Sequence, residues 1–315
     1  AVSWTDVFQG LLMLLALACV PILVISQTGS VDQFTAQINQ QNPQLLNLFT
    51  DAEGNVLSWM MIVSTMGWGL GYFGQPHILA RFMAIRSASE TGQAATIGVV
   101  WALSCYLLAI LVGLSGIAYL PEVLPDSEKV FIALTSLIFH PLIAGILLAA
   151  ILAAIMSTVD SQLLVCSSSL AEDLYPLVTR KDVSAEKRLQ IGRIAVVVLA
   201  MMATVLAMEP DNKVLDVVSY AWAGLGASLG PAILVSLYWR RMTARGALAG
   251  VLIGGATVII WSQAEGGIFD LYALVPGFAL SLVAIVTVSL IDKRRVDSST
   301  EQSFEDMHQQ VIASK

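Results

Sequence analysis

The chain has 315 residues, of which 57% are hydrophobic and 12% are charged, and its mean hydropathy is +0.77. Soluble domains carry about 25% charged residues, so the composition excludes a soluble enzyme. The net charge of −7, with no basic cluster in the sequence, excludes a nucleic-acid-binding protein. The composition predicts an all-α, polytopic protein of the lipid bilayer.

The apolar residues lie in blocks of about 20, which is the length that a helix needs to cross the hydrocarbon core. Residues 1–291 are therefore expected to form a transmembrane domain, and residues 292–315 a polar tail. The blocks predict eight spans, at roughly 7–27, 57–80, 93–119, 142–170, 191–208, 214–238, 246–262 and 271–291.

The distribution of basic residues predicts the orientation. Of the 16 Lys and Arg residues, only Lys129 and Lys213 lie in the connections 28–56, 120–141, 209–213 and 263–270. Cytoplasmic loops carry the excess of basic residues, so the other connections and the C-terminal tail are predicted to be cytoplasmic. The segment 28–56 has no Lys or Arg and is predicted to be the main external loop.

The beginning of the chain indicates a piece of a longer protein. The first residue is Ala1, and an apolar run starts at Val7 with no basic region before it and no cleavage site after it. Further N-terminal helices of the same protein are therefore expected as partners of this chain.

The second predicted span contains a pattern that weakens a helix. Four glycines fall within residues 67–74, and Pro76 follows them. Transporters expose backbone dipoles to solutes through such interruptions, and Trp68 and Tyr72 would share one face beside this one. We expect a solute site here; a kinked packing helix is the alternative.

The fourth predicted span carries an ionisable residue, Asp160, deep in an apolar run. Such a residue costs at least about 2.5–3.5 kcal/mol on insertion scales, so it is functional by default. Hydroxyls and carboxylates are the ligands of hard cations. The pattern favours an ion site; the alternative is hydroxyls bonded to their own helix and an Asp at the water interface. The candidate ligands are Ser157, Thr158, Asp160 and Ser161, with Asp6 of the first span as a second carboxylate.

Two later spans contain small residues. Residues 221–231 combine glycines with Pro231, which suits a gating helix or close packing equally well. Gly246, Gly250 and Gly254 recur every four residues, which is typical of a helix-packing face.

Several passages resemble the sodium/solute symporter family, and its proline-transporting branch most closely. They are the run from Met66 to Met83, the elements Ala153–Thr158 and Gln162–Ser168, and the shorter stretches Ser3–Asp6, Glu172–Tyr175 and Ser219–Gly224. The resemblance implies a five-plus-five inverted-repeat fold. This chain would hold the last helix of repeat one, all of repeat two and two accessory helices.

The resemblance also implies the sites. The solute site includes Trp68, Tyr72 and Pro76, and the sodium site includes Ala154, Ser157 and Thr158, each with further ligands from helices upstream of Ala1. A second sodium in some members lies among the positions of Asp6, Ser157, Asp160 and Ser161. The family pattern has a hydroxyl where this chain has Asp160, so a cation held by two carboxylates or a proton shared between them stays open.

The function implied by the resemblance is sodium-coupled import of L-proline by alternating access in the bacterial cytoplasmic membrane. One alternative keeps the mechanism and changes the solute to another amino acid, a sugar or a carboxylate. A second alternative is a transporter-like membrane sensory module. An enzyme is not expected.

Overall fold

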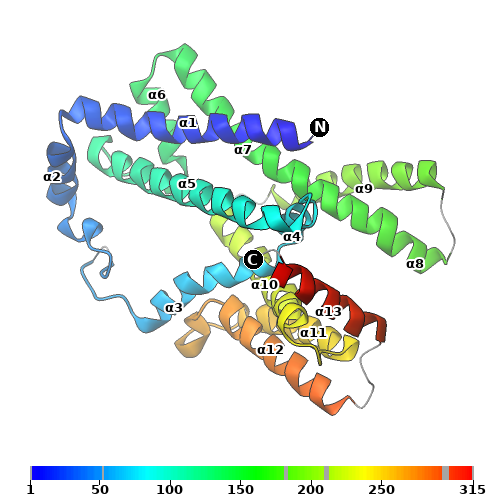
Figure 1. Cartoon of the computed structure of the whole chain (residues 1–315). Helices are drawn as coiled ribbons and strands as arrows, with labels where there is room; N and C mark the ends of the chain where they lie inside the picture. The colour runs from blue at the N-terminus through cyan, green and yellow to red at the C-terminus, as the bar shows by residue number, and fades with distance from the viewer. Residues whose placement is uncertain (1, 52, 181–183, 209–212, 293–297, 314–315) are drawn as a thin grey trace. The chain divides into compact units, whose positions relative to one another are not determined.

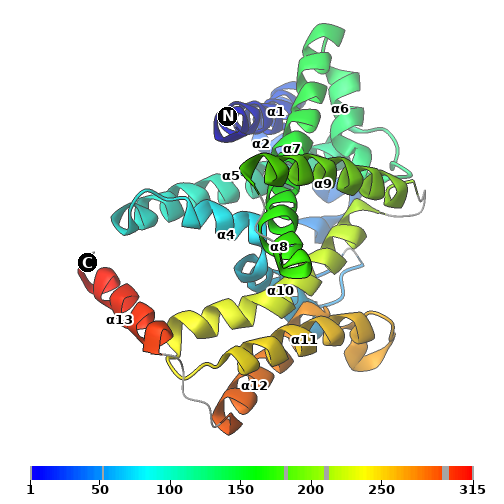
Figure 2. The same ribbon diagram turned by 90° about the vertical axis from the view of Figure 1, so that its right-hand side faces the viewer.

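The computed structural model describes residues 2–51, 53–180, 184–208, 213–292 and 298–313. The described chain is all-α, and its only β interaction is an isolated bridge between Thr50 and Val56. Contacts divide it into two compact units, residues 1–57 with 92–197 and residues 58–91 with 198–315 (Figures 1 and 2).

The first unit is built on long apolar helices that carry short helices at their ends. Its elements are α1 (Val2–Thr28), α2 (Val31–Gln41), η1 (Pro43–Leu46), α5 (Thr91–Tyr119), η4 (Ser127–Lys129), α6 (Val130–Ile138), α7 (Pro141–Ser168), the π-helical η5 (Ser169–Leu174), α8 (Tyr175–Thr179) and the first part of α9 (Ala185–Leu206).

The second unit contains the glycine-rich segment and the C-terminal helices. Its elements are α3 (Trp59–Gly67), η2 (Trp68–Gly74), α4 (Pro76–Met83), η3 (Ala88–Glu90), α10 (Val214–Tyr238), α11 (Ala244–Trp261), η6 (Gly267–Asp270), α12 (Leu274–Ile291) and α13 (Ser298–Ala313).

Seven helices in the described part of the chain are long and apolar enough to cross a membrane. They overlap seven of the eight segments predicted from the sequence. The remaining segment, 57–80, is divided among α3, η2 and α4, so no single helix spans it. The interruption predicted there is confirmed.

Local sequence explains where several helices begin. The side chains of Ser30, Ser58 and Thr243 each accept a hydrogen bond from a backbone N–H in the first turn of the helix that follows. His140 caps α7 by accepting from Leu142 N at 3.4 Å.

The core of the first unit has two parts. Val20 and Val24 of α1 pack with Phe34 and Ile38 of α2 and with Leu134 of α6, and all five side chains are at most 3% exposed. The second part joins α1 to α7 through the small buried residue Ala16, which packs against Leu147 and Ala150. These contacts fix α1 against the helix that carries the candidate ion ligands.

Glycines bring α11 against α12 in the second unit. Cβ atoms at Gly246 and Gly250 would collide with Ser289 and Ile285 of α12, so only glycine fits at either position. The Ser289 hydroxyl also accepts a hydrogen bond from Thr243 N at 3.1 Å. The packing face predicted from the glycine repeat is confirmed.

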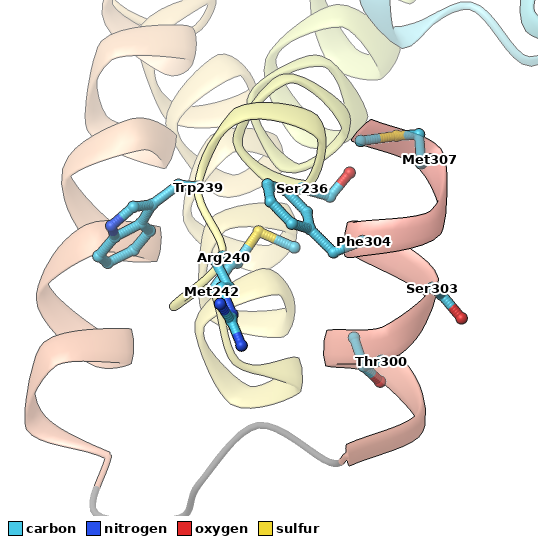
Figure 3. A pocket seen from close by; sticks show the side chains of 8 residues that line it. All are labelled: Ser236, Trp239, Arg240, Met242, Thr300, Ser303, Phe304 and Met307. Carbon is cyan, nitrogen blue, oxygen red and sulfur yellow. The ribbon is translucent and has the colours of Figure 1, made fainter. Parts of the chain in front are cut away.

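The polar tail forms α13, which lies against the C-terminal end of α10. Arg240 pairs with Glu305 at 3.0 Å and with Glu301 at 3.5 Å. Figure 3 shows the Phe304 ring pointing from α13 toward Ser236 of α10. The paired side chains are about half exposed, so each ion pair contributes little by itself.

Candidate functional site

The interrupted segment begins where α3 ends at Gly67. A 3₁₀ turn covers Trp68–Gly74, Gln75 is extended with φ −87° and ψ 110°, and α4 starts at Pro76. Proline has no N–H to donate back to the turn. The 3₁₀ turn and the extended Gln75 together end the α-helical hydrogen bonding between α3 and α4.

The glycines of this turn permit backbone contact with α10. A Cβ on Gly71 would overlap the indole of Trp222, and a Cβ on Gly74 would lie 2.7 Å from Gly226 Cα and 3.0 Å from Gly230 N. By contrast, a Cβ on Gly69 would meet nothing within 4 Å. Gly71 and Gly74 are thus required for close approach, whereas Gly69 is not.

Aromatic rings gather around the turn. Trp68 stacks on Tyr272 with ring centroids 5.5 Å apart and on Trp222 at 5.9 Å. Tyr72 meets Trp222 edge to face at 4.8 Å. These are favourable geometries for aromatic pairs, so η2, α10 and the start of α12 together form one aromatic cluster.

Hydrogen bonds tie the same rings to the backbone. Trp222 Nε1 donates to the Trp68 carbonyl at 3.0 Å, and the Tyr272 hydroxyl donates to the Ser219 carbonyl at 2.7 Å. The backbone N–H of Tyr272 donates to Ser64 Oγ at 2.9 Å. The rings are therefore fixed by polar contacts as well as by packing.

The structure brings two of the predicted solute-site residues together. Trp68 and Tyr72 both contact Trp222, and Pro76 lies half-buried at the start of α4. Trp222 and Tyr272 are absent from the sequence prediction. The glycine-rich stretch 221–231 is the sequence feature that could have pointed to Trp222. Tyr272 looks like an interfacial aromatic in the sequence, so nothing there indicated its place in the cluster.

The hydroxyls of α7 bond to their own helix. Ser157 Oγ and Thr158 Oγ1 donate to the Ala154 carbonyl at 3.0 and 3.3 Å, and Ser161 Oγ donates to the Ser157 carbonyl at 2.8 Å. This is the alternative arrangement named for this stretch. A hydroxyl that donates keeps oxygen lone pairs, so the same atoms are also able to face a cation.

The carboxylates of the candidate second cation site lie on two packed helices. Because α1 and α7 run in opposite directions (Figure 1) and meet at Ala16 and Ala150, their positions along the pair can be compared. Asp6 and Asp160 each lie ten residues from that contact, which is about 15 Å along a helix, toward the same end. Asp160 is exposed, Asp6 is half-buried and Ser161 is buried.

These features define a class of protein. A multi-pass, all-α protein with one interrupted helix packed on the backbone of a second helix has the architecture of a secondary transporter. The chain belongs to the sodium:solute symporter family, whose sequence profile matches residues 1–254.

A solved structure shows the same fold. A Na+-coupled sialic acid symporter, determined in a substrate-bound outward-open state, superposes with a TM-score of 0.71 at 18% sequence identity. The match covers 94% of this chain and 64% of the other. The fold is thus part of the inverted-repeat transporter fold that the sequence predicts.

Curated relatives are more similar in sequence. The high-affinity proline transporter PutP of Bacillus subtilis is 48% identical over 306 residues, which are 96% of this chain and 63% of the relative. Sodium/proline symporters of Salmonella typhimurium and Escherichia coli are 47% and 46% identical, over 93% of this chain and 58% of each relative. The chain therefore spans about three-fifths of the length of these relatives.

Proposed function

We propose that this protein imports L-proline together with sodium by alternating access. The observation that carries the proposal is the aromatic cluster at the interrupted segment, where Trp68 and Tyr72 both pack against Trp222. Relatives at 46–48% identity are named as proline transporters. The geometry and these names point to the same solute.

The interrupted segment suits a small apolar ring that carries charges. The rings of Trp68 and Tyr72 supply apolar surface for contact with a pyrrolidine ring. The turn and the start of α4 at Pro76 supply backbone dipoles for the carboxylate and the amine. We assign the solute site to Trp68, Tyr72 and Pro76 on this basis.

Sodium is the proposed coupling ion. A hard cation prefers oxygen ligands, and three candidate oxygens lie within one turn of α7: the Ala154 carbonyl, Ser157 Oγ and Thr158 Oγ1. The hydroxyls already lie beside this carbonyl, at 3.0 and 3.3 Å from it. Binding would then need rotation of two side chains and no change in the helix.

A second cation site is proposed at Asp6, Asp160 and Ser161. Their equal distance from the contact between α1 and α7 is what supports the assignment. With two carboxylates, the site would bind one cation tightly or hold a proton between them. The ion stoichiometry therefore depends on these residues.

The proposed setting is the bacterial cytoplasmic membrane, with the C-terminal tail in the cytoplasm. The distribution of basic residues supports this orientation. This chain matches 58–63% of the length of these relatives. We propose that further N-terminal helices of the same protein supply the remaining ligands of the solute site and the sodium site.

The test is uptake of labelled L-proline by the protein in membrane vesicles, under an inward sodium gradient. Uptake that requires the gradient and collapses with a sodium ionophore is expected. Competition by unlabelled galactose, glutamate or alanine tests the alternative solutes. Sodium-dependent uptake of one of these in preference to proline would replace the proposed solute, and binding without transport would favour the sensory module.

A further inference from the structure

Gln75 occupies an unusual place for an amide side chain. It stands at the N-cap position of α4, yet its side chain makes no capping hydrogen bond there. The residue is only 2% exposed. Burying an amide is unfavourable unless its polar atoms find partners, so the partners that it does have define what it does.

The amide nitrogen of Gln75 reaches two different elements. Nε2 donates to the Gly71 carbonyl of η2 at 3.2 Å and to the Trp222 carbonyl of α10 at 3.3 Å. Carbonyl oxygens accept hydrogen bonds and never donate, so only the NH₂ group fits between them. The orientation of the amide is therefore fixed by its partners.

These bonds act where the turn and α10 come closest. Gly71 is the residue at which the indole of Trp222 leaves no room for a Cβ. On the other side of the cluster, Trp222 Nε1 donates to the Trp68 carbonyl at 3.0 Å. Trp68, the first residue of η2, is thus bonded directly to α10. Gly71, the fourth residue, is linked to α10 through the Gln75 amide, which donates to both the Gly71 and the Trp222 carbonyls.

We propose that Gln75 is a positioning residue of the solute site. Its buried amide fastens the turn Trp68–Gly74 to α10 and thereby sets where the rings of Trp68 and Tyr72 stand. This inference rests on the proposed function, because it takes these rings to be the solute-binding surface. Gln75 itself makes no contact with solute in this account.

Two substitutions separate positioning from packing. Gln75→Leu keeps the size of the side chain and removes both donors, which leaves two buried carbonyls without this partner. Gln75→Glu keeps the shape. Its carboxylate, when ionised, only accepts and repels both carbonyls, whereas the protonated acid regains one O–H donor. Acidic pH should therefore restore the Glu variant and not the Leu variant.

The experiment measures the proline KM and maximal uptake rate for the wild type and both variants at pH 5.5 and pH 8. We expect Gln75→Leu to raise KM about tenfold or more at both pH values, the usual effect of an unpaired buried group. Gln75→Glu should match it at pH 8 and recover several-fold toward the wild-type KM at pH 5.5. The titratable neighbours Tyr72 and His77 are present in the wild type and in both variants. The KM of each variant is therefore compared with the wild-type KM at the same pH.

Gln263→Glu is the matched control, because Gln263 is exposed and lies outside the cluster. It should follow the wild type at both pH values. A wild-type KM in Gln75→Leu, or a Gln75→Glu defect that does not change with pH, would overturn the inference. Loss of the folded protein in the Leu variant leaves the pH response of the Glu variant as the deciding result.

A second readout does not depend on the solute. In Gly69→Cys, at a position where a Cβ meets nothing within 4 Å, the new thiol can be labelled with a water-soluble maleimide after Cys19, Cys105 and Cys166 are replaced by Ala. If Gln75 fastens the turn, Gln75→Leu should change the labelling rate several-fold. An unchanged rate contradicts the inference. If the wild type takes up no proline, the proposed function is refuted. The labelling rate still tests whether Gln75 fixes the position of the turn.

Discussion

The turn Trp68–Gly74 and the polar stretch Ala154–Ser161 both depart from a regular apolar helix, but different contacts stabilise them. Hydrogen bonds and ring contacts link the turn to α10 and to the start of α12. In the polar stretch, the hydroxyls of Ser157 and Thr158 donate to the Ala154 carbonyl of the same helix, α7. The first region is thus fixed by tertiary structure and the second by its own helix.

This difference has a consequence for binding. Atoms held between elements are preorganised, so a solute meets rings that are already placed. The hydroxyls of Ser157 and Thr158 donate to a carbonyl of their own helix, so they can rotate toward a cation and back without moving another element. We expect substitutions in the turn to disturb structure and solute affinity together, and substitutions in α7 to change ion affinity alone.

The largest effect is expected from Gly71→Ala. The added Cβ would overlap the Trp222 indole, and overpacking of a filled site costs about 1–3 kcal/mol. Because the overlap is severe, the cost should lie at the upper end of this range, so proline uptake should fall to about a hundredth of the wild-type rate or below, with a lower melting temperature in detergent. Gly69→Ala is the matched control, since its Cβ meets open space; equal behaviour of the two variants would contradict the observed packing.

Next in size are Trp68→Ala and Tyr72→Ala. Each removes an apolar surface whose burial is worth about 1.5–3 kcal/mol, so apparent proline affinity should fall by about ten- to a hundredfold. The sodium concentration for half-maximal binding without proline should change far less. Trp59→Ala, at a side chain 60% exposed on α3, serves as the aromatic control. Wild-type affinity in the first two variants would remove these residues from the site.

A smaller effect is expected at the candidate sodium ligands. Thr158→Ala and Ser157→Ala should raise the half-saturating sodium concentration several-fold, because each removes one ligand oxygen. Thr158→Ser keeps the oxygen and should retain most function. Thr257 makes the same bond to its own helix, Oγ1 to the Ile253 carbonyl at 2.7 Å, so Thr257→Ala is the control. If Thr158→Ser were as damaging as Thr158→Ala, packing of the methyl group would explain the result.

The smallest and most specific effect concerns the two carboxylates. Asp160→Asn and Asp6→Asn should each change the sodium or pH dependence of uptake, and the double variant should fall short of additivity because the groups would share one ion. Asp306→Asn in α13, where Asp306 is exposed, controls for charge. Normal uptake in Asp160→Asn from acidic to neutral pH at limiting sodium would indicate a residue that only meets water.

The sequence predicted local features well and partnerships between elements poorly. The interruption at 67–76 and the packing face of Gly246 follow from residue types alone, and the structure contains both. The roles of Trp222, Tyr272 and Gln75 were not predicted, because they depend on which helix lies opposite each residue. A single sequence does not show which helices pack against each other. The ion and solute assignments themselves remain predictions.

The central claim is that solute binds at the turn, that sodium binds at α7, and that binding at either site raises the affinity of the other. Proline binding to the purified protein, measured by calorimetry across a sodium series, tests this most directly. In the wild type, sodium should tighten proline binding, and proline should tighten sodium binding by the same factor. In Thr158→Ala, the increase in proline affinity should require higher sodium concentrations, but at saturating sodium the proline affinity should equal that of the wild type. Equal proline affinity with and without sodium in the wild type would contradict the account.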